Sequence, residues 1–114
     1  MTISNYIYSL VKEISESKSM DECRRLRSKL DYARAYGRGA NAINAYRDRA
    51  IEHEIKKRYR TPGAEIAVIN NYTANPDKYT AEYEAYQEFR AECKHRVDAR
   101  IEVLKGELEA ALKN

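Results

Sequence analysis

An uninterrupted helical signal over residues 76–112 constrains the fold more than any other feature of the sequence. It begins at Asn75-Pro76, which is a helix-start signal, and Gly106 only weakens it. At 1.5 Å per residue such a helix is about 55 Å long, whereas a small domain is about 30 Å across. We therefore expect the last helix to protrude, to break, or to pair with a second chain.

Apolar residues repeat along this segment with a helical period. They are Tyr79, Tyr83, Tyr86, Phe89, Cys93, Val97, Ile101, Leu104, Leu108 and Leu112. Their mean spacing of about 3.67 residues fits straight or slightly right-handed packing better than the 3.5 of a left-handed coiled coil. We therefore expect a bundle spine in a monomer or a weak homodimer. The first helix is the expected cover for the leucine-rich end, and its apolar face carries Ile3, Ile7, Leu10, Val11 and Ile14.

The rest of the chain has helical spacing too, and no window shows the alternation of a strand. Start and stop signals place the helices at about residues 3–17, 20–36, 41–59, 62–72 and 76–112. Ser19 and Glu22 have the spacing of a capping box, and Gly37 is a helix stop. The prediction is an all-α fold: a single domain over residues 1–114, built as a small bundle of about five helices with a long C-terminal helix.

Large aliphatic side chains are scarce, because Leu, Ile, Val and Phe together make only 20 of the 114 residues. The net charge is only +3, so we still expect folding, with the 10 tyrosines as core material. Cys23 and Cys93 lie among apolar residues and are expected to be reduced and packed. No apolar stretch has the length of a membrane span and the first residues lack a secretion signal, which predicts no membrane partner and a cytoplasmic location.

Motifs for catalysis and for metal binding are incomplete. Glu92 and His95 have the spacing of one half of a helical di-iron site. The other histidine, His53, has Ala50 three residues before it, so the second half is missing. Lys57 stands where a zincin helix needs its second histidine. The sequence therefore predicts a protein that is not an enzyme and that uses no metal and no cofactor.

Charge is unevenly distributed along the chain. Residues 21–60 hold 12 Lys and Arg against 6 Asp and Glu, whereas residues 61–114 hold 7 against 10. A basic segment with tyrosines is typical of nucleic-acid binding, in which cations neutralise phosphates and rings stack on bases. The candidates are Arg24, Arg25, Arg27, Lys56, Lys57, Arg58, Tyr59 and Arg60, with Tyr32 and Tyr36 as further stacking residues. Cations near a helix C-terminus also favour the helix dipole, which is a structural explanation for part of this run.

Three tyrosines, Tyr79, Tyr83 and Tyr86, share one face of the last helix. The glutamates that flank them are Glu82, Glu84 and Glu88. One interpretation is that the tyrosines belong to the core. The other is a protein interface, because tyrosine presents a large ring with a polar tip and the acidic edges suit a basic partner.

The function that we expect is that of a non-enzymatic helical protein-binding module, which occupies a surface of another macromolecule. Small chains without catalytic motifs, rich in tyrosine and charge, are common among the accessory and inhibitor proteins of phages and mobile elements. The most favoured partner is a protein of unidentified kind. The alternative is a nucleic-acid-binding protein that uses the basic face of residues 21–60.

Overall fold

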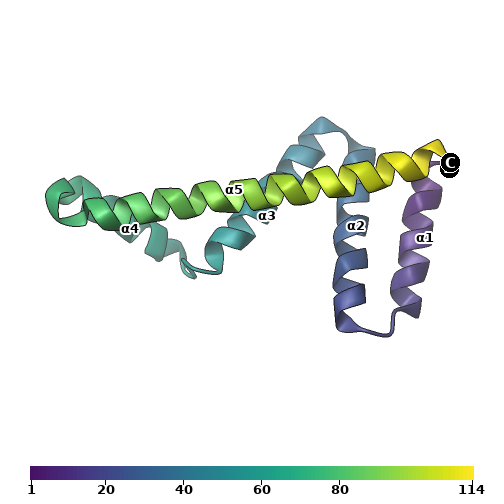
Figure 1. Ribbon diagram of the computed structural model, residues 1–114, viewed down its shortest axis with the longest axis horizontal. Coiled ribbons are helices and arrows are strands. Elements are labelled where there is room, and N and C mark those ends of the chain that lie inside the picture. The colour runs from purple at the N-terminus through teal and green to yellow at the C-terminus, as the bar shows by residue number, and fades with distance from the viewer. The chain divides into compact units, whose positions relative to one another are not determined.

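Residues 1–114 form five α-helices and no β-strand in the computed structural model (Figure 1). The helices are α1 (Ile3–Glu16), α2 (Met20–Arg38), α3 (Ala40–Lys56), α4 (Pro62–Ala74) and α5 (Pro76–Lys113). The predicted all-α class and the long C-terminal helix are confirmed. None of the five helices combines the length and the apolar character that crossing a membrane requires.

Side-chain caps define where the helices begin. Ser19 Oγ accepts a hydrogen bond of 3.1 Å from the backbone N–H of Glu22, which is the serine half of the predicted capping box. Thr61 Oγ1 accepts one of 3.2 Å from the N–H of Ala64, and Pro62 occupies the first helical position. The first N–H groups of a helix have no partner within the helix, so these bonds stabilise the two starts at the predicted residues.

Helix α3 ends three residues earlier than the sequence predicts. Its last residue is Lys56, and the backbone N–H groups of Arg58 and Tyr59 both donate to the carbonyl of Ile55. This tightened turn places the ring of Tyr59 against that of Phe89, with the centroids 5.9 Å apart. A tightened last turn of this kind closes a helix, which explains why α3 ends before residue 59.

The chain packs as two compact units. The first comprises Met1–Asp48 together with Ala99–Asn114, and the second comprises Arg49–Asp98. Helices α3 and α5 contribute residues to both units. The single domain over residues 1–114 stays a prediction.

Helices α1 and α2 form an antiparallel hairpin in the first unit (Figure 1). Apolar residues of both helices share one core with the end of α5. The leucines of this core are Leu10, Leu26, Leu30, Leu104 and Leu108, and Ile3, Ile7, Ile14, Ile101 and Leu112 pack around them. The predicted cover of the leucine-rich end by the first helix is therefore confirmed. Fully burying one such side chain contributes about 1.5–3 kcal/mol, so these contacts dominate the stability of the unit.

Helix α2 is also buried on a second face, which the sequence pattern does not predict. Tyr32 is only 2% exposed, and its ring meets that of Tyr46 in α3 edge-on, with the centroids 5.8 Å apart. The ring of Tyr36, which is half-buried, lies 6.2 Å from that of Tyr32. Tyr32 is therefore a core residue, which corrects its sequence-based assignment as a residue that stacks on bases.

The core of the second unit is built from α3, α4 and α5. Its buried apolar side chains are Ile51, Ile55, Val68, Tyr86, Cys93 and Val97. Cys93 is buried and Cys23 of the first unit is half-buried, which confirms the predicted packing of both cysteines. Their reduced state stays a prediction. All ten apolar positions predicted for the seam of the last helix are buried or half-buried, so the period of the sequence identified its inner face correctly.

Two glycine-to-alanine substitutions should have opposite effects on stability. Helix α2 stops at Gly39 and not, as the sequence predicts, at Gly37, because Gly39 and not Gly37 has a positive φ, of 106°. This φ strains any residue with a Cβ, so Gly39→Ala should lower the free energy of unfolding by about 1 kcal/mol. Gly106 lies within α5 with open space around it, so Gly106→Ala should raise it by about 0.5–1 kcal/mol. Urea unfolding followed by circular dichroism measures both values. If both substitutions changed the free energy of unfolding in the same direction, the assignment of Gly39 to a helix end and of Gly106 to a helix interior would be contradicted.

Candidate functional site

The tyrosine face predicted for protein binding is partly a core face. Tyr86 is 1% exposed, so no partner reaches its ring, which corrects its assignment as a partner-binding residue. Tyr83 is half-buried and stacks on Tyr72 of α4, with the ring centroids 4.1 Å apart and the planes inclined by 9°. Tyr79 is also half-buried, and the ammonium of Lys78 lies 5.3 Å from its ring centroid. The three glutamates Glu82, Glu84 and Glu88 are exposed, but Glu82 and Glu84 are two residues apart and lie on different sides of the helix, so they form no single row beside the tyrosines.

The hydroxyl of Tyr86 is the centre of a hydrogen-bonded group. It donates to Glu65 Oε1 of α4 at 2.7 Å and accepts from Arg90 Nη1 at 2.9 Å. Arg90 Nη1 also lies 3.6 Å from Glu65 Oε1. A buried hydroxyl needs such partners, because an unsatisfied one costs roughly 1–3 kcal/mol. The group therefore connects α4 to α5 within the second unit.

The protonation of this group fits a structural role. Burial raises the pKa of Tyr86 above its ordinary value of 10.0, and the hydrogen bond to Glu65 raises it further. The hydrogen bond to Tyr86 also raises the pKa of Arg90. A catalytic acid or base works best with a pKa near the working pH, and neither shift moves toward neutrality.

Tyr86→Phe should weaken the second unit and change its response to alkaline pH. The lost hydrogen bonds should lower the free energy of unfolding by about 1 kcal/mol at pH 8. The folded pKa of Tyr86 exceeds its unfolded value, so its contribution is complete below pH 10 and is lost as the pH rises through the folded pKa. The variant should therefore lose less stability above pH 10 than the wild type does. Urea unfolding from pH 8 to 11.5 tests this, with Tyr8→Phe at an exposed tyrosine as the control; parallel pH curves for wild type and Tyr86→Phe would contradict it.

The basic run that follows α3 is largely paired within the second unit. Lys56 Nζ lies 2.8 Å from Glu52 Oε1, and this contact raises the pKa of Lys56 and lowers that of Glu52. Lys57 Nζ lies 3.0 and 3.2 Å from the two carboxylate oxygens of Glu54, which is only 5% exposed. A buried carboxylate needs a cation beside it, so Lys57 has a structural task. Both lysines are exposed and remain candidates for nucleic-acid binding, but part of their charge is already balanced.

Two further residues of this run pack on aromatic rings. The guanidinium carbon of Arg58 lies 5.1 Å from the ring centroid of Phe89. Tyr59 is half-buried, and its ring meets that of Tyr86 edge-on with the centroids 5.0 Å apart. Tyr59 therefore belongs to an aromatic cluster, which corrects its assignment as a residue that stacks on bases. Arg60 is exposed and has no such contact.

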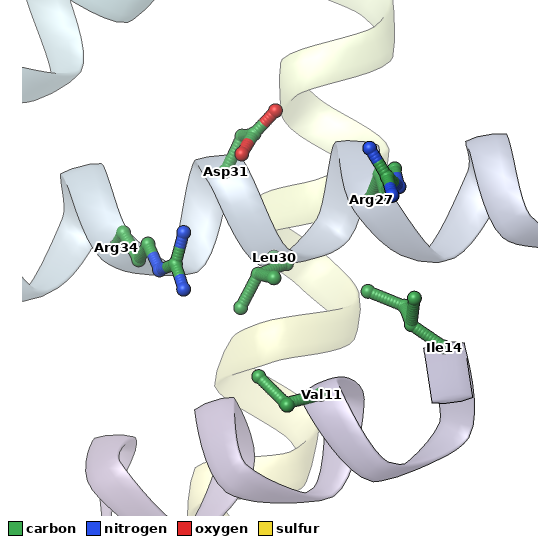
Figure 2. A pocket seen from close by; sticks show the side chains of 6 residues that line it. All are labelled: Val11, Ile14, Arg27, Leu30, Asp31 and Arg34. Atoms are coloured by element: carbon green, nitrogen blue, oxygen red, sulfur yellow. The ribbon is translucent and has the colours of Figure 1, made fainter. Parts of the chain in front are cut away.

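An open groove of about 300 Å³ lies between α1 and α2 in the first unit. Its floor is formed by Val11 and Ile14 of α1 and by Leu30 of α2. Figure 2 shows Leu30 pointing from α2 toward α1, where Val11 and Ile14 point toward it. Val11 is 44% exposed, although the sequence places it on the inner face of the first helix. The groove thus offers apolar surface that the unit itself leaves uncovered.

Three charged residues of α2, Arg27, Asp31 and Arg34, line the edge of this groove and belong to a longer row on that helix, which we call the arginine stripe. Its members are Arg24, Arg27, Asp31, Arg34 and Arg38, at steps of three and four residues along one face of the helix. All five are exposed, and none forms an ion pair with another residue of the chain. Asp31 lies between Arg27 and Arg34 along α2 (Figure 2). The sequence-based candidates Arg24 and Arg27 therefore belong to one larger surface.

The third candidate on α2, Arg25, lies on another side of the helix. It lines a second groove, of about 320 Å³, together with Val103 of α5, which is 60% exposed. At the same groove Lys29 Nζ lies 3.0 Å from Glu107 Oε2, so its charge is paired. Arg25 therefore does not belong to the arginine stripe and provides a matched control for it.

Sequence reasoning missed Arg34, Arg38 and the apolar floor. The steps of three and four that join the arginines were readable in the sequence, so a search of α2 for a one-sided row would have found both arginines. The exposure of Val11 could not be predicted from the sequence, because it depends on the distance between α1 and α2.

No three side chains among His, Cys, Asp and Glu gather as a metal site. No protein-family model matches the chain, and it has no match among curated proteins or solved structures.

Proposed function

We propose that this chain is a non-enzymatic helical protein-binding module and that its partner binds at the groove between α1 and α2. The observation that carries the proposal is the exposed side chain of Val11, next to the half-buried Ile14 and beside arginines that have no acidic partner in the chain. Exposed apolar surface with a polar rim is typical of protein interaction sites. Arginine is also enriched where protein interfaces carry most of their binding energy.

The groove supports this function better than the tyrosine face does. On the tyrosine face Tyr86 is buried and Tyr83 is stacked, so little aromatic area is left for a partner. At the groove Val11 is 44% exposed and the charged rim residues are exposed, while Leu30 is buried, so apolar contact at Val11 and charge pairing at the rim are available in the same place. Charge pairs at the rim would steer association and fix the register, while the floor supplies affinity.

The finer form of the proposal is an accessory or inhibitor protein, of the kind that phages and mobile elements use, acting in the cytoplasm. Its support is the small size of the chain, its high content of charge and tyrosine, and a binding surface without a catalytic group beside it. Such a protein acts by covering a surface of its partner and needs no chemistry of its own.

Photo-crosslinking should map the binding face. A photoreactive phenylalanine analogue in place of Val11 should capture a protein from a lysate of the source organism, and nuclease treatment should not reduce the yield. The same analogue in place of Val103 or Tyr79 should capture much less. Arg27→Glu with Arg34→Glu should abolish capture at position 11 while circular dichroism stays unchanged. Capture mainly through position 79 or 103 would contradict the assignment of the groove.

The alternative function is nucleic-acid binding, and the unpaired arginines are the observation that favours it. Arg24, Arg27, Arg34 and Arg38 extend over about 21 Å of helix, which is long enough to contact several phosphates. Asp31 stands in the middle of this row and opposes phosphate binding. The apolar floor has no use in phosphate contact, so protein binding is the proposal we favour.

A mobility-shift titration with a duplex of about 20 base pairs tests the alternative. If the stripe contacts phosphates, Arg24→Ala with Arg38→Ala should weaken binding and reduce the slope of log affinity against log salt by about 1.8. If the basic run contacts the phosphates instead, replacing Lys56, Lys57, Arg58 and Arg60 by alanine should weaken binding and reduce the salt slope, and the two stripe substitutions should not. Absence of any shift by the intact protein at about 50 mM salt would exclude both versions.

A further inference from the structure

The order of charges along the arginine stripe is nearly symmetric about its centre. Arg27 and Arg24 lie four and seven residues before Asp31, and Arg34 and Arg38 lie three and seven residues after it. Read in either direction along α2, the signs are two positive, one negative, two positive. The stripe is about 21 Å long, which is the length of a four-turn helix.

Asp31 is the residue of this row that has no structural explanation. It lies one turn from Arg27 and from Arg34, at spacings where ion pairs usually form on a helix. It nevertheless pairs with neither, although all three side chains line the same groove. An aspartate here weakens the attraction of the stripe for any uniformly negative ligand, because like charges brought together at an interface cost binding energy.

We propose that the occupant of the groove is an acidic amphipathic helix of a partner protein, with a cation at the middle of its acidic edge. This inference rests on the proposed function and names the partner element at the same site. The apolar row of the helix lies on the floor made by Val11, Ile14 and Leu30. Its charged edge lies along the stripe, with carboxylates at the four arginines and a lysine or arginine at Asp31.

The charge pattern serves selection rather than tight binding. Each exposed ion pair contributes little to affinity, but a like charge at any of these positions lowers the affinity of a partner with the wrong sequence. A helix with a uniformly acidic edge meets Asp31 with a like charge. Because the sign order is nearly symmetric, it selects the partner without selecting the direction in which its helix runs.

Two other occupants fit the groove less well. A nucleic acid presents phosphates of a single sign and no apolar group for the floor. A second copy of this chain would present the exposed acids of α5, among them Glu84, Glu88 and Glu92. That face carries Ala81 and Ala91 among its acids and no cation at its middle, so it matches neither the floor nor the sign order. A second row of α5, formed by Asp98, Glu102, Lys105 and Glu109, does have a cation among its acids. Glu102 and Glu109 raise the pKa of Tyr32 and Glu109 is half-buried, so this row faces α2 of its own chain.

Two synthetic helical peptides of about 18 residues and identical composition test the inference. Each has a leucine row beside a charged row of four glutamates and one lysine. In the matched peptide the lysine is central, with glutamates about one and two turns to either side. In the permuted peptide the lysine exchanges places with a terminal glutamate. Fluorescence anisotropy with the full chain at about 50 mM salt should show about tenfold tighter binding of the matched peptide.

Variants of the full chain extend the test. Asp31→Lys should abolish the preference between the two peptides, because the single lysine of either peptide then faces a cation. Asp48→Lys, at an exposed aspartate of α3, should leave the preference unchanged. Arg27→Glu with Arg34→Glu should weaken the matched peptide at least tenfold, and Arg25→Glu should not. Val11→Ser should weaken both peptides about equally, because it changes only the floor.

Several outcomes would overturn the inference. Equal affinity of the two peptides would show that Asp31 does not select, and no binding of either would remove the helix as the occupant. A duplex that binds more tightly than the matched peptide and is insensitive to Val11→Ser would assign the stripe to nucleic acid. Self-association of the chain that is lost in Arg27→Glu with Arg34→Glu would assign the groove to a second copy. Crosslinking through position 11 tests the proposed function separately, since it does not depend on the sign order.

Discussion

Both units close their cores with tyrosine rings, and each ring brings a hydroxyl that restricts what lies around it. In the second unit the hydroxyl of Tyr86 needs a donor and an acceptor, and Arg90 and Glu65 supply them. Glu65 is the only charged residue of α4, and its contact with Tyr86 joins α4 to α5 together with the stacking of Tyr72 on Tyr83. The scarcity of leucine and phenylalanine is the reason that tyrosine has this role, because few other large side chains are present to fill the space.

Some of the charged side chains also have structural roles in the cores, and others do not. Lys57 balances the buried carboxylate of Glu54, and Arg58 covers the ring of Phe89, so part of the basic run of the second unit holds the structure together. The arginines of the stripe on α2 form no ion pair within the chain, and only Arg38, in the last turn of α2, also favours the helix dipole. Cations without an acidic partner in the chain are those best placed to meet another protein, which is why the stripe and not the run supports the proposed function.

The groove and the core of the first unit depend on the same helix pair. Leu10 and Leu26 draw α1 and α2 together in the core that covers the end of α5. Val11, one residue from Leu10, is left at the outer edge of this contact, where it forms the floor of the groove with Leu30. A partner helix would therefore extend a packing interface that already exists, and the chain need not rearrange to accept it.

The sequence by itself determined the all-α class, the helix starts at Ser19 and Thr61, and the inner face of the last helix. These features follow from local hydrogen bonds and from a period of side chains along one helix, which need no knowledge of neighbours. Tertiary structure alone decided that Tyr32 and Tyr86 are core residues, that Tyr59 joins an aromatic cluster, and that Val11 is uncovered. Burial is set by which helices approach from which side, and a helix such as α2, packed on two faces, has no single stripe from which its neighbours can be predicted.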